Sequence, residues 1–425
     1  MAEIPADLVA ECVHCGFCLP TCPTYLLWGE EMDSPRGRIH LMRQVLDGAA
    51  INESMAVHFD RCLGCMACVT ACPSGVKYDE LIEATRAAVE PRVARPARDR
   101  AMRTAVFGLF TDPRRLRWMR GPLRGYQRAG LDRLVRRSPV LGRLPTVEAM
   151  AGLLPPLGPV EPIPAHTPAE GRRRARVGLL LGCVQREFFP AVNAATVRVL
   201  AAEGCEVIAP PSQGCCGALS LHAGRETEAL NRAKRLIASF ESQAVDAIVV
   251  NVAGCGSAMK DYGRLLADDP RWSERAVAFS AKCLDVSELL VELGPVAPRH
   301  PVPVVAAYHD ACHLGHAQGV RRQPRELLAG VPGFELREIA ESDICCGSAG
   351  VYNLFEPAAA RELGDRKAAR VAATEAEVLV TGNPGCLMQI DAALRRAGRS
   401  IRLAHTVEVL DASIRGSSLA ASTPR

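Results

Sequence analysis

The feature that most constrains this chain is a cysteine motif that occurs twice near the amino terminus. The first copy is Cys12-Val-His-Cys-Gly-Phe-Cys-Leu-Pro-Thr-Cys-Pro23, and the second is Cys62-Leu-Gly-Cys-Met-Ala-Cys-Val-Thr-Ala-Cys-Pro73. Both have the spacing C-x₂-C-x₂-C-x₃-C-P, in which the short spacers turn three successive thiolates back toward one centre. In iron–sulfur proteins with two such motifs, these three cysteines bind one cluster. The fourth cysteine, which precedes proline, is directed away and binds the cluster of the other motif.

This spacing predicts a ferredoxin-type domain with two [4Fe–4S] clusters. The predicted ligands are Cys12, Cys15, Cys18 and Cys72 for one cluster, and Cys62, Cys65, Cys68 and Cys22 for the other. The alternatives are a pair of zinc sites or buried free thiols. Zinc sites need neither the third cysteine at this spacing nor the proline, so the doubled motif favours iron–sulfur clusters.

A second cysteine pattern is repeated in the C-terminal half, and in each copy one cysteine precedes an adjacent Cys-Cys-Gly triplet and another follows it. The cysteines are Cys183, Cys215, Cys216 and Cys255 in one copy, and Cys312, Cys345, Cys346 and Cys386 in the other. The glycine lets the backbone approach whatever the sulfurs bind. Because the spacing recurs, it favours a metal or redox site, holding iron–sulfur or zinc, over packing cysteines or transient disulfides.

The other cysteines and the nearby histidines fit less clearly into these patterns. Cys205 and Cys283 have no counterpart in the other repeat, so we interpret them as core residues. His309, His313 and His316 surround Cys312 and are candidates for a ligand or proton carrier. The alternative is that they are hydrogen-bonded loop histidines.

Short apolar runs alternate with helical patterns after residue 173, which predicts parallel sheets covered by helices. We therefore predict a multidomain α and α/β protein, with an α-helical ferredoxin-type two-cluster domain followed by two similar α/β cysteine-rich (CCG) domains. The predicted regions are 1–90 for the ferredoxin-type domain, 91–172 for an Arg-rich helical segment and Pro-rich linker, 173–300 and 301–415 for the CCG domains, and 416–425 for a flexible tail.

The region between the ferredoxin-type and CCG domains is strongly basic. From Arg92 to Arg176 it contains nineteen arginines, no lysine and six acidic residues, a net charge of +13. We expect a helical segment interrupted at Gly121-Pro122, followed by an extended linker with eight prolines between Pro139 and Pro168. The arginines suggest a contact with anionic lipid or an acidic partner, and the alternative is a solvated helical linker.

The composition limits the possible functions of the 425 residues. Apolar runs are too short to span a membrane, and a net charge of +4 argues against a nucleic-acid binder. The first residues lack a secretory signal, so we expect a cytoplasmic protein. No dinucleotide fingerprint, Walker motif or G-x-S-x-G is present, so we expect no flavin or NAD in this chain and assign no catalytic residue. Clusters that move single electrons need a two-electron donor such as a flavin on another chain.

The two motif types together resemble a family of iron–sulfur proteins that includes the iron–sulfur subunits of glycolate oxidase, of lactate utilisation and of anaerobic glycerol-3-phosphate dehydrogenase, and heterodisulfide reductase. The segments that carry this similarity span residues 12–386 and are most similar to the glycolate oxidase group. Apart from the cysteine motifs they are Thr21-Cys-Pro-Thr-Tyr25, Asp33-Ser-Pro-Arg-Gly-Arg-Ile39, Tyr308-His-Asp-Ala-Cys-His-Leu-Gly-His316 and Gln323-Pro-Arg-Glu-Leu-Leu328.

This resemblance implies that flavin-bearing partner subunits oxidise glycolate to glyoxylate. The chain would then pass the electrons toward a membrane acceptor of the quinone type, as a peripheral protein on the inner face of the cytoplasmic membrane. The alternatives are another substrate, lactate or glycerol-3-phosphate, a thiol or disulfide reductase, or a zinc-stabilised docking scaffold. The chain also departs from the heterodisulfide reductases, whose CCG domains end in C-x-x-C, because Val252 and Asn383 replace the first cysteine of that pair.

Overall fold

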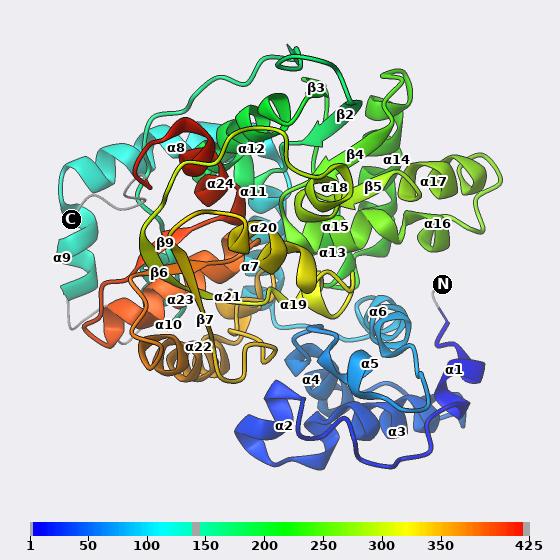
Figure 1. Cartoon of the computed structure of the whole chain (residues 1–425). Coiled ribbons are helices and arrows are strands. Elements are labelled where there is room, and N and C mark those ends of the chain that lie inside the picture. Colours follow the sequence, from blue (N-terminus) through cyan, green and yellow to red (C-terminus); the bar gives the residue numbers. More distant parts are fainter. Residues whose placement is uncertain (1–2, 138–144, 420–425) are drawn as a thin grey trace.

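The computed structural model describes residues 3–137 and 145–419. In Figure 1 the helical N-terminal domain lies at the bottom, the first α/β domain at the upper right and the second on the left. The N-terminal elements are α1 (Ala6–Ala10), α2 (Pro23–Trp28), η1 (Glu31–Asp33), α3 (Pro35–Leu46), α4 (Glu53–Arg61), α5 (Ala67–Ala71) and α6 (Tyr78–Val89). Met42, Phe59 and Leu81 are fully buried in the core of this domain, and the cysteine loops run between its short helices.

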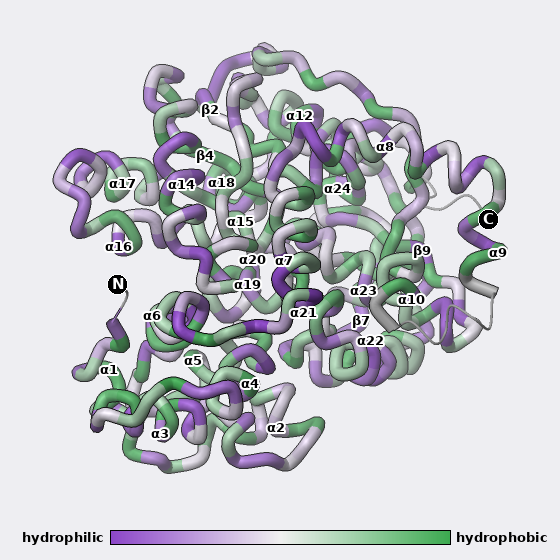
Figure 2. Tube along the Cα trace, turned by 180° about the vertical axis from the view of Figure 1, so that it is seen from behind, coloured by the Kyte–Doolittle hydropathy of each residue, from purple (hydrophilic) through white to green (hydrophobic). Residues whose placement is uncertain are grey.

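Four helices connect the N-terminal domain to the sheets: α7 (Ala97–Phe110), α8 (Pro113–Arg128), α9 (Leu131–Arg137) and α10 (Pro145–Leu153). Seen from behind, α9 alternates between hydrophilic and hydrophobic residues, as expected for a surface helix (Figure 2). Among residues 3–137 and 145–419, no helix combines the length and apolar character needed to cross a membrane.

The expected helix break at Gly121-Pro122 was wrong, because α8 continues through Pro122. Proline removes one backbone hydrogen bond, but contacts on both sides of Pro122 support the helix. Leu116 packs with Cys183 and Cys215, and the Gln127 amide both donates to the Pro155 carbonyl and accepts from Leu157 N–H, each at 2.9 Å. Tertiary packing therefore overrides the local propensity.

The expected extended linker between Pro139 and Pro168 was also partly wrong. Residues 145–153 form α10, which packs against helices of the second α/β domain. Residues 154–165 contain no regular element, and 138–144 lie outside the described residues. The predicted tail differs too, since Leu419 is buried in the core shared by the α/β domains, while 420–425 are not described.

The first α/β domain contains a five-stranded sheet in the order β1-β3-β2-β4-β5, in which β1 alone is antiparallel. Its strands are β1 (His166–Thr167), β2 (Ala175–Leu180), β3 (Cys205–Ile208), β4 (Ala247–Val250) and β5 (Cys283–Asp285). Its helices are α11 (Val184–Phe188), α12 (Pro190–Ala202), α13 (Ala218–Leu221), α14 (Glu226–Glu241), α15 (Ala253–Lys260), α16 (Tyr262–Leu265), α17 (Ser273–Ser280) and α18 (Val286–Leu293). Cys205 and Cys283 are buried in strands β3 and β5, as expected for core residues.

The second α/β domain contains a parallel sheet in the corresponding order β7-β6-β8-β9. Its strands are β6 (Val304–Tyr308), β7 (Phe334–Glu338), β8 (Val378–Val380) and β9 (Arg402–Ala404). Its helices are α19 (Cys312–Gly315), α20 (Arg322–Ala329), α21 (Tyr352–Phe355), α22 (Pro357–Ala372), α23 (Pro384–Arg396) and α24 (Thr406–Arg415). The matching strand order confirms the predicted multidomain α and α/β fold with two similar parallel-sheet domains.

The two α/β domains pack against each other through equivalent elements. In the first domain, helix α12 lies after the first parallel strand and packs against α24, the last helix of the second domain. In the second domain, α20 lies after the first strand and packs against α18, the last helix of the first domain. The contacts are therefore reciprocal, as across a two-fold interface. As a consequence, the carboxyl ends of β2, β4, β6 and β8, where the predicted cysteines lie, face a common region.

Candidate metal centres and the cavity between them

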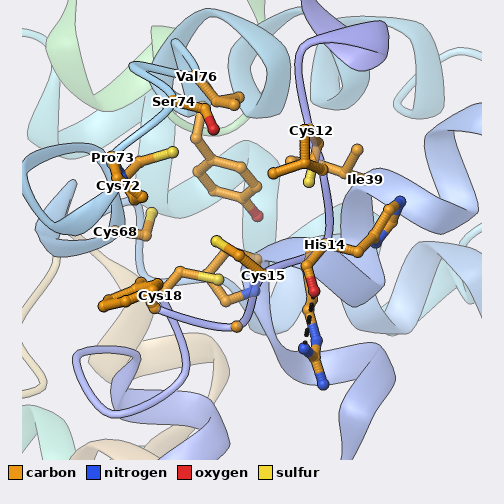
Figure 3. Close-up of a pocket in the computed structure, with 16 residues that line it drawn as sticks. Cys12, His14, Cys15, Cys18, Ile39, Cys68, Cys72, Pro73, Ser74 and Val76 are labelled. Carbon is orange, nitrogen blue, oxygen red and sulfur yellow. Dashed lines mark hydrogen bonds between the residues drawn. The ribbon is translucent and has the colours of Figure 1, made fainter.

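The first pocket is formed by the loop between α1 and α2 and by the end of α5. Its lining includes Cys12, Cys15, Cys18 and Cys72, the four cysteines predicted to hold one cluster, around a space of about 30 Å³. Figure 3 shows sulfur atoms from both motifs directed toward this shared space. The structure therefore brings a cysteine of the second motif to three cysteines of the first, 54 or more positions earlier in the chain.

The second pocket contains the complementary set. Cys22, Cys62, Cys65 and Cys68 line a space of about 20 Å³. Cys68 also lines the first pocket, so the two pockets are adjacent. Four convergent thiols in each small pocket fit the ligand requirement of a [4Fe–4S] cluster.

A buried positive charge lies beside the second pocket. Arg38 is fully buried, donates from Nε to the His58 carbonyl at 2.6 Å and approaches Asp33 at 3.5 Å. Burial raises the pKa of the Cys62 thiol, but Arg38, Arg86 and a hydrogen bond from Gly64 N–H lower that pKa overall. The surroundings of Cys62 therefore favour the thiolate, which is the form that binds metal.

Four cysteines also converge in the first CCG domain. Cys183 immediately precedes α11 and Cys255 lies in the first turn of α15, while Cys215 and Cys216 lie on the loop before α13. The Cys183 and Cys215 sulfurs are 3.6 Å apart, and Cys216 interacts with both Cys215 and Cys255. Hydrogen bonds from the Cys183 and Cys216 thiols hold the pKa of Cys215 well below its usual range.

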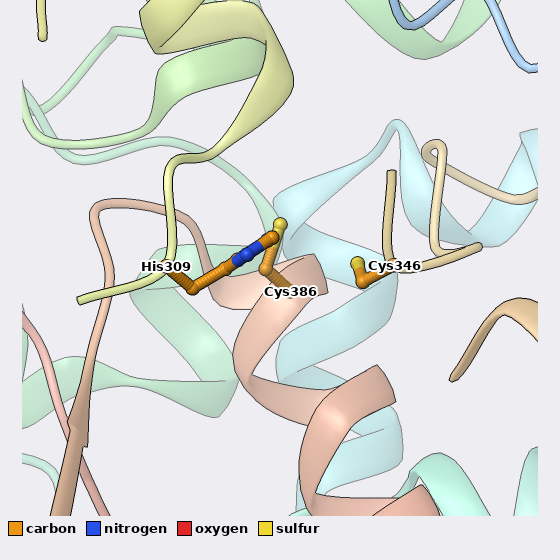
Figure 4. Close-up of side chains that lie close together, drawn as sticks. All are labelled: His309, Cys346 and Cys386. Atoms are coloured by element: carbon orange, nitrogen blue, oxygen red, sulfur yellow. The ribbon is translucent and has the colours of Figure 1, made fainter. Parts of the chain in front are cut away.

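The second CCG domain repeats this arrangement. Cys345 interacts with Cys312 and Cys346, and Cys346 interacts in turn with Cys386. Hydrogen bonds from Cys345 and Cys386 hold the pKa of Cys346 well below its usual range. His309 joins this group, since its ring, Cys346 and Cys386 offer ligand atoms within 4.8 Å of one another (Figure 4).

The loop that carries each cysteine pair has the same backbone conformation in both repeats. Gly217 and Gly347 both have φ +88°, in the left-handed region that favours glycine, and donate their N–H groups to the Cys215 and Cys345 sulfurs. A Cβ on Gly347 would lie 2.6 Å from the Ala360 carbonyl oxygen of α22. The glycine is thus needed for close packing of the loop on a helix. The sequence suggested instead that it lets the backbone approach the bound group.

A large apolar cavity of about 590 Å³ lies between the two CCG sites. Its lining includes all eight CCG cysteines and Cys65 of the second pocket. The opposite wall comes from the connecting helices, and consists mainly of Leu116, Met119, Leu123, Tyr126, Met150 and Ala151. This cavity was not predicted from the sequence; its signal is the helical spacing of Leu116, Met119, Leu123 and Val135, all of which line it.

Two of the three candidate histidines dock the N-terminal domain on the second CCG domain. His313 donates from Nε2 to the Gly64 carbonyl at 2.8 Å, and His316 Nδ1 lies 2.8 Å from the Thr70 hydroxyl. Leu63 and Cys65 pack in one cluster with Cys312 and Cys345. The second pocket and the second CCG site therefore lie side by side.

The cysteine regions match known families. Residues 8–76 match the 4Fe-4S dicluster domain, residues 98–154 match the linker region of the glycolate oxidase iron-sulfur subunit, and residues 177–260 and 306–391 each match the cysteine-rich CCG domain. These matches indicate that the chain binds iron–sulfur clusters.

Three curated proteins illustrate the similarity. The "Probable glycolate oxidase iron-sulfur subunit" of Bacillus subtilis (strain 168) is 41% identical over 94% of this chain and 92% of its own length. The "Glycolate oxidase iron-sulfur subunit" of Escherichia coli (strain K12) is 35% identical over 96% and 95%. "Lactate utilization protein A" of an Exiguobacterium species is 33% identical over 56% of this chain and 98% of its own.

Among solved structures, a hypothetical protein from Helicobacter pylori aligns with a TM-score of 0.43 and 9% identity, over 66% of this chain and 56% of its own, which is too distant to bear on function. The resemblance found in the cysteine motifs is confirmed by the matches to the linker region and to nearly full-length relatives. The chain belongs to the family of glycolate oxidase iron–sulfur subunits.

Proposed function

We propose that this chain carries electrons within a glycolate-oxidising complex. Flavin-bearing partner subunits oxidise glycolate to glyoxylate, and this chain passes the electrons toward a membrane acceptor of the quinone type. The observation that carries the proposal is the unbroken series of cysteine sites, in which Cys68 lines both N-terminal pockets and Cys65 lines both the second pocket and the cavity.

The ligand assignment follows the two pockets. Cys12, Cys15, Cys18 and Cys72 would hold one [4Fe–4S] cluster, and Cys22, Cys62, Cys65 and Cys68 would hold the other. Such clusters take up and release single electrons. The eight CCG cysteines would hold further iron–sulfur or zinc groups, one in each repeat.

We place the electron entry at the loop between α1 and α2. Cys15 is exposed, and its neighbours Val13 and Phe17 are 69% and 64% exposed. Exposed apolar side chains beside a redox site suit a protein partner, because their burial on docking would exclude water from the shortest path into the chain. The partner expected here is a flavoprotein.

We place the acceptor in the cavity between the CCG sites. Its volume lies in the usual range for small-molecule pockets, and its mainly apolar wall suits a quinone ring or tail. The helices that form this wall also carry exposed Trp118 and Leu134 among arginines. Such a surface suits peripheral binding to anionic lipid on the cytoplasmic face of a membrane.

The decisive experiment is co-expression of the chain with its candidate flavoproteins, followed by glycolate-dependent reduction of a short-chain quinone. The proposal expects co-purification, and quinone reduction that is lost when Cys68 is replaced by serine. Turnover that persists at the original rate in Cys68→Ser would contradict it.

Lactate is a second candidate substrate, since the relatives named "Lactate utilization protein A" match more than half of this chain. Comparing glycolate, lactate and glycerol-3-phosphate as electron donors to the same complex distinguishes these functions. Disulfide reduction is less favoured, because buried Val252 occupies a position where a fifth cysteine would be needed. A heterodisulfide substrate should therefore give no turnover.

A further inference from the structure

His309 is a buried polar side chain without an ordinary partner. It directly follows β6, is fully buried, and its backbone N–H donates to the Val380 carbonyl at 2.9 Å. Neither ring nitrogen has a hydrogen-bond partner of normal geometry among the described residues. Buried polar groups are nearly always satisfied in native proteins, so a group missing from the bare chain is expected beside this ring.

The ring faces sulfur. The ligand atoms of His309, Cys346 and Cys386 lie within 4.8 Å of one another, and all three residues are buried (Figure 4). Imidazole nitrogen with thiolate sulfur is a common donor combination for zinc and occurs in some iron–sulfur centres. His309 also helps to lower the pKa of Cys346, so the ring and this sulfur are close enough to act on one bound group.

The first repeat offers an internal comparison. The residue equivalent to His309, three positions before the strand-end cysteine, is Leu180. Leu180 is buried in the same cluster as Cys216, the counterpart of Cys346. The two repeats therefore present a methyl-bearing side chain and an imidazole to equivalent sulfur atoms.

A second difference lies after β8, at the residue that precedes α23. Asn383 donates from its amide to the Cys386 sulfur at 3.4 Å, whereas the equivalent residue in the first repeat is Val252, which has no donor. The second site thus differs from the first by a nitrogen donor beside the sulfurs and by a hydrogen bond to sulfur, and both features tune metal–thiolate centres.

We propose that His309 is a ligand of the metal group held by the second CCG site, so that this site is a mixed cysteine–histidine centre and the first is an all-cysteine centre. This inference rests on the proposed function, in which the CCG cysteines hold metal. A neutral imidazole leaves the centre less negative than a thiolate does, which at an iron–sulfur cluster raises the reduction potential.

The test uses the full chain purified without oxygen and labelled with ¹⁵N-histidine. If the second site holds iron, pulsed paramagnetic resonance should detect ¹⁵N coupled to the cluster; if it holds zinc, X-ray absorption should show one nitrogen in a shell of sulfurs. His309→Leu, which copies the first repeat, should remove that nitrogen signal, while His313→Asn should retain it.

Two outcomes overturn the inference in distinguishable ways. A nitrogen signal absent from the wild type, or unchanged in His309→Leu, shows that His309 is not a ligand while the electron-transfer function stands. A metal content that is the same in wild type and Cys346→Ser shows that the second site holds no metal, and removes the premise as well. Unchanged signals from the two N-terminal clusters show that each variant has folded.

Discussion

His313 donates a hydrogen bond from Nε2 to the carbonyl oxygen of Gly64, 2.8 Å away and 249 positions earlier in the chain. Gly64 lies within the second cluster motif, and His313 directly follows Cys312 of the second CCG site. Burial, with a smaller effect of His222, lowers the pKa of His313 to about 4. The ring is therefore neutral at physiological pH, and its hydrogen bond connects the second cysteine motif of the N-terminal domain to the second CCG site.

Replacing His313 by alanine should weaken the contact between the N-terminal domain and the second CCG domain without removing the N-terminal clusters. The loss of one buried hydrogen bond costs about 1–2 kcal/mol, so amide hydrogen exchange in residues 62–68 should become faster. His166→Ala is the control, because His166 is largely exposed and its pair with Glu206 lies at the edge of the first sheet, away from the N-terminal domain. Equal exchange in both variants would mean that His313 does not fix the two domains together.

Replacing Arg38 by glutamine should lower the reduction potential of the second cluster. Arg38 is a buried cation beside Cys22 and Cys62, and it stabilises the extra negative charge of the reduced state. We expect a shift of roughly 50–100 mV to more negative values, since 59 mV corresponds to a tenfold change for one electron. A redox titration followed by paramagnetic resonance measures it, with Arg38→Lys as the charge-preserving variant, and equal shifts in both would contradict the electrostatic explanation.

Replacing Phe17 by aspartate should weaken binding of the flavoprotein partner. The side chain is 64% exposed, so the substitution should leave the fold and the iron content unchanged. We expect the dissociation constant of the complex, measured by light scattering or calorimetry, to rise at least about tenfold, or 1.4 kcal/mol. Val296→Asp, an equally exposed site away from this loop, is the control, and the same loss in both variants would exclude a specific entry surface.

Filling the cavity should block the acceptor and spare the clusters. Ala151 lines the cavity from α10, and Ala151→Trp would occupy part of its volume. We expect quinone reduction to fall at least about tenfold while reduction of a small soluble dye is retained, because the dye can take electrons at the exposed N-terminal pocket. Ala267→Trp, on an exposed turn after α16, should leave both rates unchanged. If the acceptor reacts elsewhere, Ala151→Trp will behave like that control.

Stability should fall in mild acid because of His405. This ring is buried between the α/β domains, 2.9 Å from the Asn251 carbonyl, and burial lowers its pKa to about 4. In the unfolded chain the pKa is near 6.5, so the unfolded state binds the extra proton first as the pH falls. The full contribution of the neutral ring to the free energy of unfolding is present above pH 6.5 and is lost progressively toward pH 4. At pH 5 the loss amounts to about 1–2 kcal/mol. Denaturant unfolding at pH 7.5 and pH 5 measures it, and His405→Asn should reduce the pH dependence; an unchanged dependence would contradict this cause.

Much of the site could be predicted because cysteine spacing is a local property. The two motifs at Cys12 and Cys62 predicted two sets of four thiols, and the members of each set line one of two adjacent pockets, with Cys68 lining both. The repeated runs ending near Cys183 and Cys312 likewise predicted two similar sheets, since short apolar runs that alternate with helical patterns are typical of buried parallel strands.

What could not be predicted depends on contacts between distant segments. Pro122 would break an isolated helix, whereas contacts of Leu116, Arg120 and Gln127 with other elements support α8 on both sides of it. The apolar cavity exists because the connecting helices close over two sheet ends. The roles of His309 and His313 differ although they are four positions apart, because one faces sulfur inside the domain and the other faces the N-terminal domain.

The central claim is that the N-terminal cysteines hold two adjacent iron–sulfur clusters with exchanged fourth ligands. The most direct test is iron and acid-labile sulfide analysis of the anaerobically purified chain, with paramagnetic resonance after reduction. We predict at least about eight irons and eight sulfides per chain, magnetic interaction between two clusters, and loss of the same signal in Cys12→Ser and Cys72→Ser. A colourless protein with fewer than about four irons after reconstitution, and no signal on reduction, would contradict the account.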